Sequence, residues 1–338
     1  MDVGYTPLLS FVGTLLALGV TKTFERVLTR RQDASDLTRD VLVDFASTLT
    51  SVERTLAVLA REPAVSRRED LPSISSAFSR RPPTISLERM LGVFHDERLH
   101  RSLMLFFDRQ ALFAESSDER RAAFYWLIDR PETPAEDLAA QERLGVIRHS
   151  RAQMTQHCLD MLRHGYEVVE HLFERAERAF APMRSDFAET RAFLKSKYGL
   201  DSETLRLRRA YYSAERLGGD EVQAAPFDPG LDYGLTTWEG PLANEVAARG
   251  GCLQLRLESP SQDCRLLLSF SPETEVALPR NARVVRAHVY LRGPGADGVH
   301  HAVELEQLGV TRPPVVGRVR LEGRSHARLG DVLRERGQ

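Results

Sequence analysis

One pair of residues has the spacing of metal ligands on a helix. Glu97 and His100 form a Glu-x-x-His pair, which places a carboxylate and an imidazole on one helical face. In four-helix bundles, two such pairs and two further carboxylates hold a di-iron or di-manganese centre. A second pair is missing from this chain, so we expect a solvated or packed polar turn, with a metal site in the bundle as the alternative.

A glycine pattern resembles a phosphate-binding loop in spacing only. Gly293, Gly295 and Gly298 match Gly-x-Gly-x-x-Gly. A dinucleotide site needs a strand before these glycines and a helix after them, so that the helix N-terminus meets the pyrophosphate. Here the flanking residues predict strands on both sides, and a hairpin loop is therefore the better interpretation.

Three histidines repeat at a regular interval. His157, His164 and His171 are spaced by seven residues and share one face of a predicted helix. Successive members lie about 10 Å apart at 1.5 Å rise per residue, so they cannot share one metal ion. We interpret them as surface or bundle-edge residues, with a pH-responsive face as the alternative.

A locally basic stretch also contains tyrosines, a combination that suits nucleic-acid or phosphate binding. A solvated helix face is the ordinary alternative. The net charge of the chain is -2, which gives no global attraction to nucleic acid, and we expect no nucleic-acid partner. The residues of this possible basic patch are Lys195, Lys197, Arg206, Arg208 and Arg209.

The N-terminal segment carries the clearest signal of location. The 19 residues from Val3 to Thr21 contain no charged side chain, and about 20 such residues cross a hydrocarbon core. A cleaved secretory signal fits poorly, because only Met1 and Asp2 precede the segment and no clear cleavage site follows Leu18. A buried core helix is the other alternative, since Pro7, glycines and hydroxyl residues dilute the apolar ones.

The charges after this segment predict its orientation. Basic residues exceed acidic ones there, and cytoplasmic flanks carry such an excess. We therefore expect a single-pass inner-membrane helix with the bulk of the chain in the cytoplasm. The basic residues are Lys22, Arg26, Arg30 and Arg31, against Glu25.

Small residues line one face of the same segment. Gly13, Ala17 and Thr21 recur every four residues, the spacing that lets helix backbones approach closely within lipid. This pattern favours a homo-oligomer whose membrane helices contact one another.

Apolar residues at steps of three and four predict a helical bundle over residues 23–217. One coiled-coil-like seam lies in a helix that Pro63 ends, and another lies in the longest helix, which begins near Thr133 and extends towards Phe180. The first seam is Leu42, Phe45, Leu49, Val52, Leu56 and Leu59. The second is Ile147, Met154, Cys158, Met161, Val168 and Leu172.

Three further helical regions are predicted between and after these, the first from about Ser86 to Ala114. Ser116 and Glu119 have the spacing of a capping box, which we expect to open a new helix closed by Pro131. A shorter helical stretch extends from Asp186 to about Leu217.

The C-terminal third has a different period. Residues 218–250 read as a linker or irregular lead-in, and apolar alternation from 251 to 338 predicts a small antiparallel β sandwich or barrel, with a short C-terminal helix. Cysteines at 252 and 264 flank a hairpin centred near Ser261. Cys252 is expected to face about Ser269 and Cys264 about Leu257, which places the two cysteines poorly for a disulfide.

The sequence thus predicts an anchor helix at 1–22, a mainly α body and a C-terminal β domain. No nucleophile, catalytic base or cofactor motif stands out, and the scarcity of lysine suggests a GC-rich bacterial genome. The leading hypothesis is a membrane-anchored, non-catalytic sensor or scaffold, whose β domain binds a protein or small molecule and whose helices oligomerise. The alternatives are a membrane-acting effector of a bacterial immunity or signalling system and a metal-dependent enzyme with a site in the bundle.

Overall fold

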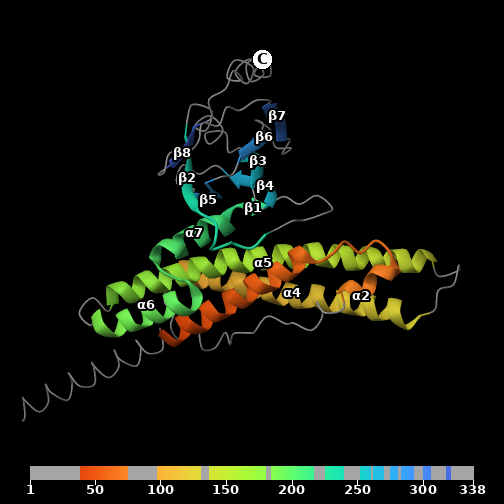
Figure 1. Cartoon of the computed structure of the whole chain (residues 1–338), viewed down its shortest axis with the longest axis horizontal. Coiled ribbons are helices and arrows are strands. Elements are labelled where there is room, and N and C mark those ends of the chain that lie inside the picture. The colour runs from red at the N-terminus through yellow and green to blue at the C-terminus, as the bar shows by residue number, and fades with distance from the viewer. Residues whose placement is uncertain are drawn as a thin grey trace, which may run out of the picture.

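The structure is a computed structural model. It describes residues 39–74, 97–130, 137–179, 184–216, 225–239, 252–259, 262–269, 275–280, 283–292, 300–305 and 317–320. The described part is mainly helical, as the sequence predicts, with strands toward the C-terminus (Figure 1).

Long helices form the body. A helix over residues 39–61 lies against α4 (Glu97–Asp129) and α5 (Asp137–Ala179), which run side by side (Figure 1). The shorter helices α6 (Arg184–Tyr198) and α7 (Ser202–Ser213) follow, and α7 lies between α5 and the strands. A 3-10 turn, η1 (Arg68–Asp70), and α2 (Leu71–Ile74) follow helix 39–61.

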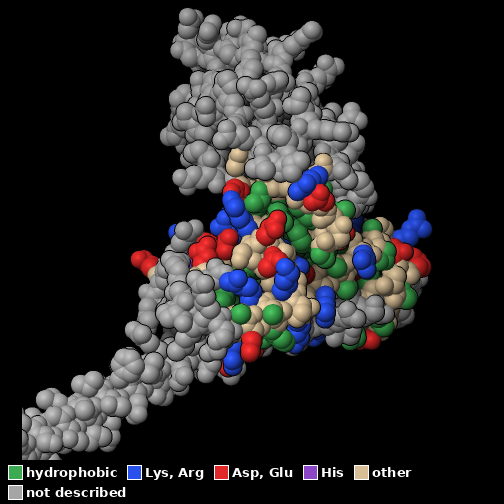
Figure 2. Space-filling view, turned by 60° about the vertical axis from the view of Figure 1, so that its left-hand side comes forward, with side chains coloured by type: hydrophobic (Ala, Val, Ile, Leu, Met, Phe, Trp, Pro, Cys, Tyr) green, Lys and Arg blue, Asp and Glu red, His purple; other side chains and the backbone are tan. Residues whose placement is uncertain are grey.

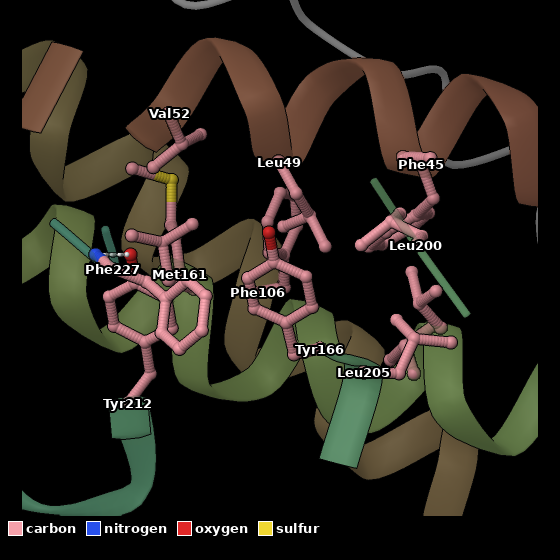
Figure 3. Close-up of a cluster of buried hydrophobic side chains, with 14 of the residues drawn as sticks. Phe45, Leu49, Val52, Phe106, Met161, Tyr166, Leu200, Leu205, Tyr212 and Phe227 are labelled. Carbon is pink, nitrogen blue, oxygen red and sulfur yellow. Dashed lines mark hydrogen bonds between the residues drawn. The ribbon is translucent and has the colours of Figure 1, made fainter. Parts of the chain in front are cut away.

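The two predicted seams form the core. Each of the six seam residues of helix 39–61 is at most 3% exposed, and each of the six in α5 at most 6%. Phe45, Leu49 and Val52 point from helix 39–61 into a cluster that includes Phe106 of α4 and Met161 of α5 (Figure 3). Spacing by three and four therefore identified the buried faces correctly, because it puts apolar side chains on one side of each helix.

Gly165 allows helix 39–61 and α5 to approach each other closely. A Cβ atom at this position would clash with Cδ2 of Leu49 and lie 3.3 Å from its Cγ. Leu49 is fully buried, so its side chain has little room to move away.

Ser116 does not begin a helix. The structure corrects this prediction, because α4 continues from Glu97 to Asp129 and Ser116 is 5% exposed within it. Apolar residues on both sides of Ser116, among them Phe113 and Leu127, are buried, and their packing outweighs the local capping signal.

The helix predicted from Asp186 to about Leu217 is divided in two. Gly199 adopts a positive φ of 63°, and its N–H donates to the Lys195 carbonyl at 3.0 Å, which ends α6. Asp201 then caps α7 by accepting from the Thr204 N–H at 2.9 Å. The sequence signal for this break was Gly199 followed two residues later by Asp201.

The strands pair into two sheets. The first has the order β1 (Glu215–Arg216), β4 (Gln262–Ser269), β3 (Cys252–Ser259), β6 (Arg283–Arg292) and β7 (His300–Leu305). The second has the order β5 (Val276–Pro279), β2 (Tyr233–Glu239) and β8 (Gly317–Arg320). Among the described strands, all pairings are antiparallel except that of β2 with β8, which is parallel and departs from the predicted antiparallel arrangement.

The predicted hairpin register is confirmed. Cys252 pairs with Ser269 and Cys264 with Leu257 in the β3–β4 ladder, so the two cysteines are not opposite each other. Strands β6 and β7 also pair antiparallel, through Leu291 with His301 among others. The segment 293–299, which holds the three glycines of the Gly-x-Gly-x-x-Gly pattern, lies outside the described residues but joins these two strands.

Part of the predicted linker is packed structure. Strand β2 and the residues before it lie within 218–250, and Phe227 and Tyr233 are only 7% and 5% exposed. Both belong to the apolar cluster that holds the first seam and all of the α5 seam except Ile147. The aromatic residues of this glycine-containing stretch therefore pack into the core, and this part of the stretch is not an irregular lead-in.

Within the described part of the chain, no helix combines the length and the apolar character needed to cross a membrane. The anchor segment from Val3 to Thr21, with Gly13, Ala17 and Thr21, lies outside the described residues. The helix predicted after Ser325 lies outside them too.

Replacing Gly165 with alanine tests the close helix crossing. We expect Gly165→Ala to lower the free energy of unfolding by about 1–3 kcal/mol, because the added methyl overpacks against Leu49. Gly145→Ala is the matched control on the same helix, where a Cβ would meet nothing within 4 Å, and it should be neutral or stabilise by up to about 1 kcal/mol. Urea unfolding of both variants measures the difference, and equal stability changes would contradict the crossing.

Candidate functional site

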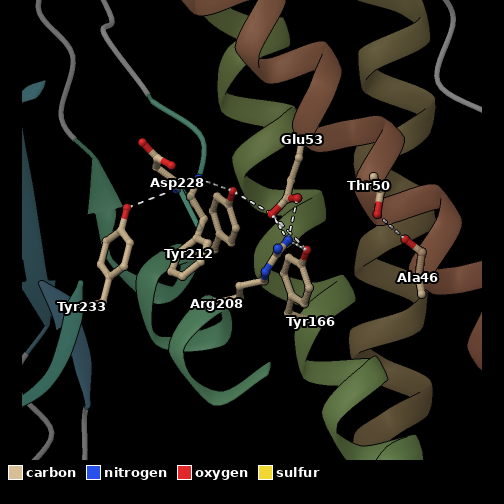
Figure 4. Close-up of polar contacts among 9 residues, drawn as sticks. Ala46, Thr50, Glu53, Tyr166, Arg208, Tyr212, Asp228 and Tyr233 are labelled. Carbon is tan, nitrogen blue, oxygen red and sulfur yellow. Dashed lines mark hydrogen bonds and ion pairs between the residues drawn. The ribbon is translucent and has the colours of Figure 1, made fainter. Parts of the chain in front are cut away.

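A buried ion pair joins the first helix of the body to the helix beneath the strands. Arg208 of α7 and Glu53 of helix 39–61 lie at the centre of a polar cluster (Figure 4). The Nη1 atom of Arg208 donates to Glu53 Oε2 at 2.6 Å and to Oε1 at 2.8 Å. The two side chains are 7% and 13% exposed.

Two tyrosines complete this cluster. The Tyr166 hydroxyl of α5 donates to Glu53 Oε1 at 2.9 Å, and the Tyr212 hydroxyl of α7 donates to the same oxygen at 3.1 Å. The Tyr166 oxygen also accepts from Arg208 at 2.8 Å. We call the four residues Glu53, Tyr166, Arg208 and Tyr212 the junction, because they come from three helices and meet at one carboxylate.

Burial and neighbouring charges shift the pKa values of Tyr166, Tyr212 and Arg208. Burial, and after it the Glu53 charge, raises the pKa of Tyr166 and Tyr212 well above the usual value, so both hydroxyls keep their protons and donate. Burial acts to lower the pKa of Arg208, but Tyr166 and Glu53 outweigh it and raise that pKa. Near neutral pH, Arg208 is therefore a charged donor and the two tyrosines are neutral donors to the Glu53 side chain.

An aromatic cluster extends the junction toward strand β2. The rings of Tyr166 and Tyr212 stack with centroids 5.7 Å apart, and Phe227 and Tyr233 stack at 4.4 Å. Tyr211 contacts Phe227 and Tyr233 edge-on, each at 5.5 Å. The junction and the start of β2 thus form one continuous packed unit.

Backbone groups of the segment before β2 are bound to the same tyrosines. The Phe227 N–H donates to the Tyr212 hydroxyl at 2.8 Å, and the Tyr211 hydroxyl donates to the Ala225 carbonyl at 3.1 Å. The Asp228 N–H donates to the Tyr233 hydroxyl at 3.1 Å (Figure 4). Residues 225–233 are therefore attached to α7 by both apolar packing and hydrogen bonds.

A more exposed contact joins α7 to the neighbouring strand. Arg206 forms an ion pair with Glu275, the residue before β5, and its Nε donates to Glu275 Oε2 at 2.9 Å. The Arg206 side chain is 53% exposed. Strands β2 and β5 both contact α7, so α7 is the base on which the three-stranded sheet rests.

A second ion pair holds the other end of helix 39–61. Glu62 and Arg120 of α4 pair with side chains only 3% and 2% exposed. Burial, and after it the charge of Arg151, lowers the pKa of Arg120 to about 10, which still leaves the guanidinium charged near neutral pH. Arg151 of α5 donates to the Leu59 carbonyl at 3.0 Å and thereby binds the last turn of the helix.

A polar hollow lies where α4, α5 and α7 meet. Its volume is about 150 Å³, and within it Arg209 forms an ion pair with Glu170 at 2.9 Å while the Ser102 hydroxyl donates to Glu167 at 2.9 Å. Burial raises the pKa of Glu170, an effect that Arg209 counteracts. The lining residues are Leu99, Ser102, Glu167, Glu170, His171, Glu174 and Arg209.

The proposed metal ligands belong neither to the junction nor to the lining of the polar hollow. Glu97 and His100 occupy the first turn of α4, and both are exposed. In the described part of the chain, no group of three or more His, Cys, Asp or Glu side chains is arranged to hold a metal ion.

The residues of the possible basic patch are used within the fold. Arg208 is buried in the junction, Arg206 pairs with Glu275, and Arg209 pairs with Glu170. Lys195 pairs with Asp201 at 3.1 Å, and Lys197 lies over the Phe193 and Tyr198 rings at 5.0 and 5.3 Å. On the face shown in Figure 2, basic and acidic side chains of the described body are interspersed.

The junction itself was missed by the sequence analysis, although a signal was present. Glu53 lies between the seam residues Leu49 and Leu56, and Arg208 lies between the buried residues Leu205 and Tyr212. A charged residue on the apolar face of each of two helices indicates a buried pair when the charges are opposite.

Neither a protein-family model, nor a curated protein, nor a solved structure matches this chain.

Breaking the junction should destabilise the protein strongly. Glu53→Gln leaves the Arg208 guanidinium buried without a carboxylate, and we expect a loss of about 3–5 kcal/mol in the free energy of unfolding. Arg206→Gln removes a more exposed ion pair on α7, the helix that carries Arg208, and should cost less than about 1 kcal/mol. Urea denaturation compares the two, and a Glu53→Gln loss no larger than that of the control would refute the importance of the junction.

Proposed function

We propose that this protein is a membrane-anchored, non-catalytic sensor or scaffold, in which the β region binds a ligand or partner and helix 39–61 relays that event toward the N-terminal segment. The supporting observation is the junction. Through Arg208 and Glu53 it binds the helix under the β2–β5 sheet to the first described helix of the chain.

The direction of the relay follows from chain order. Helix 39–61 is the first described element after the uncharged segment from Val3 to Thr21. A displacement of α7 would act directly on Glu53, in the middle of this helix, because a buried charge does not separate from its partner without a large cost. The β region and the anchor would therefore be coupled through a single helix.

We further propose that residues 1–22 form a single-pass inner-membrane helix, with the bulk of the chain in the cytoplasm. Residues 23–217 form the bundle, and 251–338 form a β domain in which the sheets pack as a sandwich or barrel. The basic flank of the anchor supports the orientation, and the small-residue face of Gly13, Ala17 and Thr21 supports a homo-oligomer.

Membrane fractionation tests the anchor. Full-length protein should stay in the pellet after high-salt and alkaline washes, because an inserted helix is not released by removing charge contacts. A chain beginning at Thr23 should be soluble and folded, with the strong helical circular dichroism of the bundle. Recovery of the full-length chain in the aqueous fraction without detergent would reject the anchor, and aggregation of the shorter chain would instead indicate a core helix.

Crosslinking in native membranes tests the assembly. Replacing both Gly13 and Ala17 with Leu should block close approach of the helices and weaken association by on the order of 1 kcal/mol, while insertion is preserved because both replacements are apolar. Leu8→Ile with Leu15→Ile is the matched control on the opposite face of the segment. An oligomer distribution unchanged by the first pair of replacements would remove the membrane helix from the assembly.

A further inference from the structure

Two histidines of α5 have ring nitrogens that are buried without a hydrogen bond. His157 and His164 are half-buried, and Nδ1 of each lacks a hydrogen-bond partner among the described residues. Ser150 Oγ, about two turns before His157 on α5, and Gln153 Oε1, about one turn before it, share this condition. A strip of unsatisfied polar atoms therefore follows α5 for about four turns.

Charged groups of both α4 and α5 act electrostatically on the two rings. Arg109 and Asp108 of α4 act on His157 together with Asp160 of α5, and Arg109 pairs with Asp160 at 3.4 Å. On His164 the acting groups are Arg163, Asp160, Glu167 and Arg109. Two groups of α4 act on His157 and one, Arg109, acts on His164. Because Arg109 pairs with Asp160 of α5 and the two helices pack along each other, both rings lie near the α4–α5 contact.

The net effect of this setting disfavours the charged ring. Burial, followed by Arg109, lowers the pKa of His157, while Asp160 and Asp108 oppose the shift. Burial, followed by Arg163, lowers the pKa of His164, while Asp160 and Glu167 oppose it. For both histidines, burial and the neighbouring arginines lower the pKa by more than the carboxylates raise it.

The unpartnered Nδ1 atoms give a geometric reason for the same preference. A neutral imidazole carries one N–H, and the other nitrogen is an acceptor whose missing partner is tolerated more easily. An imidazolium carries an N–H on both nitrogens, so protonation would place a charged donor without an acceptor inside the interface.

We propose that the α4–α5 interface is a proton-sensitive contact, closed when His157 and His164 are neutral and weakened when both rings are protonated. The proposal concerns the bundle alone and does not depend on the anchor or on ligand binding by the β region.

The direction of the pH effect follows from linkage. A histidine whose folded-state pKa lies below the ordinary value of 6.5 binds fewer protons folded than unfolded, so its contribution to stability is complete above pH 6.5 and is lost as pH falls through the folded-state pKa. Glu170 has a raised pKa and acts in the opposite direction. A comparison of variants is therefore needed to isolate the histidines.

Unfolding of the full-length protein in detergent tests this contact. Between pH 7.5 and 5.5 the unfolding constant of the wild type should rise, by up to tenfold for each unit by which folding lowers a histidine pKa. The double variant His157→Gln, His164→Gln should lose most of this dependence, whereas His100→Gln with His149→Gln, at two exposed positions, should retain it. Equal pH dependence in the wild type and in the first double variant would overturn the proposal.

A second measurement on the unmutated protein covers the case in which the double variant fails to fold. With selectively ¹³C-labelled histidine, the ring signals of His157 and His164 should titrate below pH 6.5. Titration of both rings at or above pH 6.5 would overturn the proposal as well.

Discussion

The ion pair between Glu53 and Arg208 is the constraint on which the arrangement of the helices depends. Removing two charges from water costs several kcal/mol for each ion, and the cost is recovered only when the partners and the remaining hydrogen-bonding groups are correctly placed. Glu53 receives donors from Arg208, Tyr166 and Tyr212, which belong to two different helices. The relative positions of helix 39–61, α5 and α7 are therefore specified together.

Apolar packing alone would specify these positions less well. Leucine and phenylalanine seams specify a register less sharply, since hydrophobic burial is non-directional. A buried carboxylate has no such freedom, and the Glu62–Arg120 pair adds a second fixed point at the far end of the same helix. The close crossing at Gly165 lies next to Tyr166, so the steric and polar constraints on helix 39–61 coincide.

The sequence allowed a good prediction of local structure wherever one periodic signal dominated. The seams through Leu49 and Met161, the long helix α5 and the register of Cys252 with Ser269 follow from spacing alone. The prediction was wrong at Ser116, where buried neighbours on α4 override a capping signal, and between α6 and α7, where Gly199 and Asp201 mark a break.

The junction was harder to predict for a different reason. Glu53 and Arg208 are each recognisable as charges on an apolar helix face, but their pairing joins positions far apart in the chain, and other opposite charges were available to each. Residues 225–233 likewise gain their structure from Tyr211 and Tyr212 rather than from a pattern of their own. Long-range partners of this kind are set by the packed fold and not by local propensity.

Amide hydrogen exchange in full-length Arg208→Met protein tests the coupling between α7 and helix 39–61 most directly. If the junction links them, amides around Glu53 in helix 39–61 and those of α7 should lose protection together, because removal of the guanidinium leaves the Glu53 carboxylate buried without its counter-charge. Arg206→Gln should leave both segments protected. Loss of protection in α7 while helix 39–61 keeps its wild-type exchange rates would contradict the coupling.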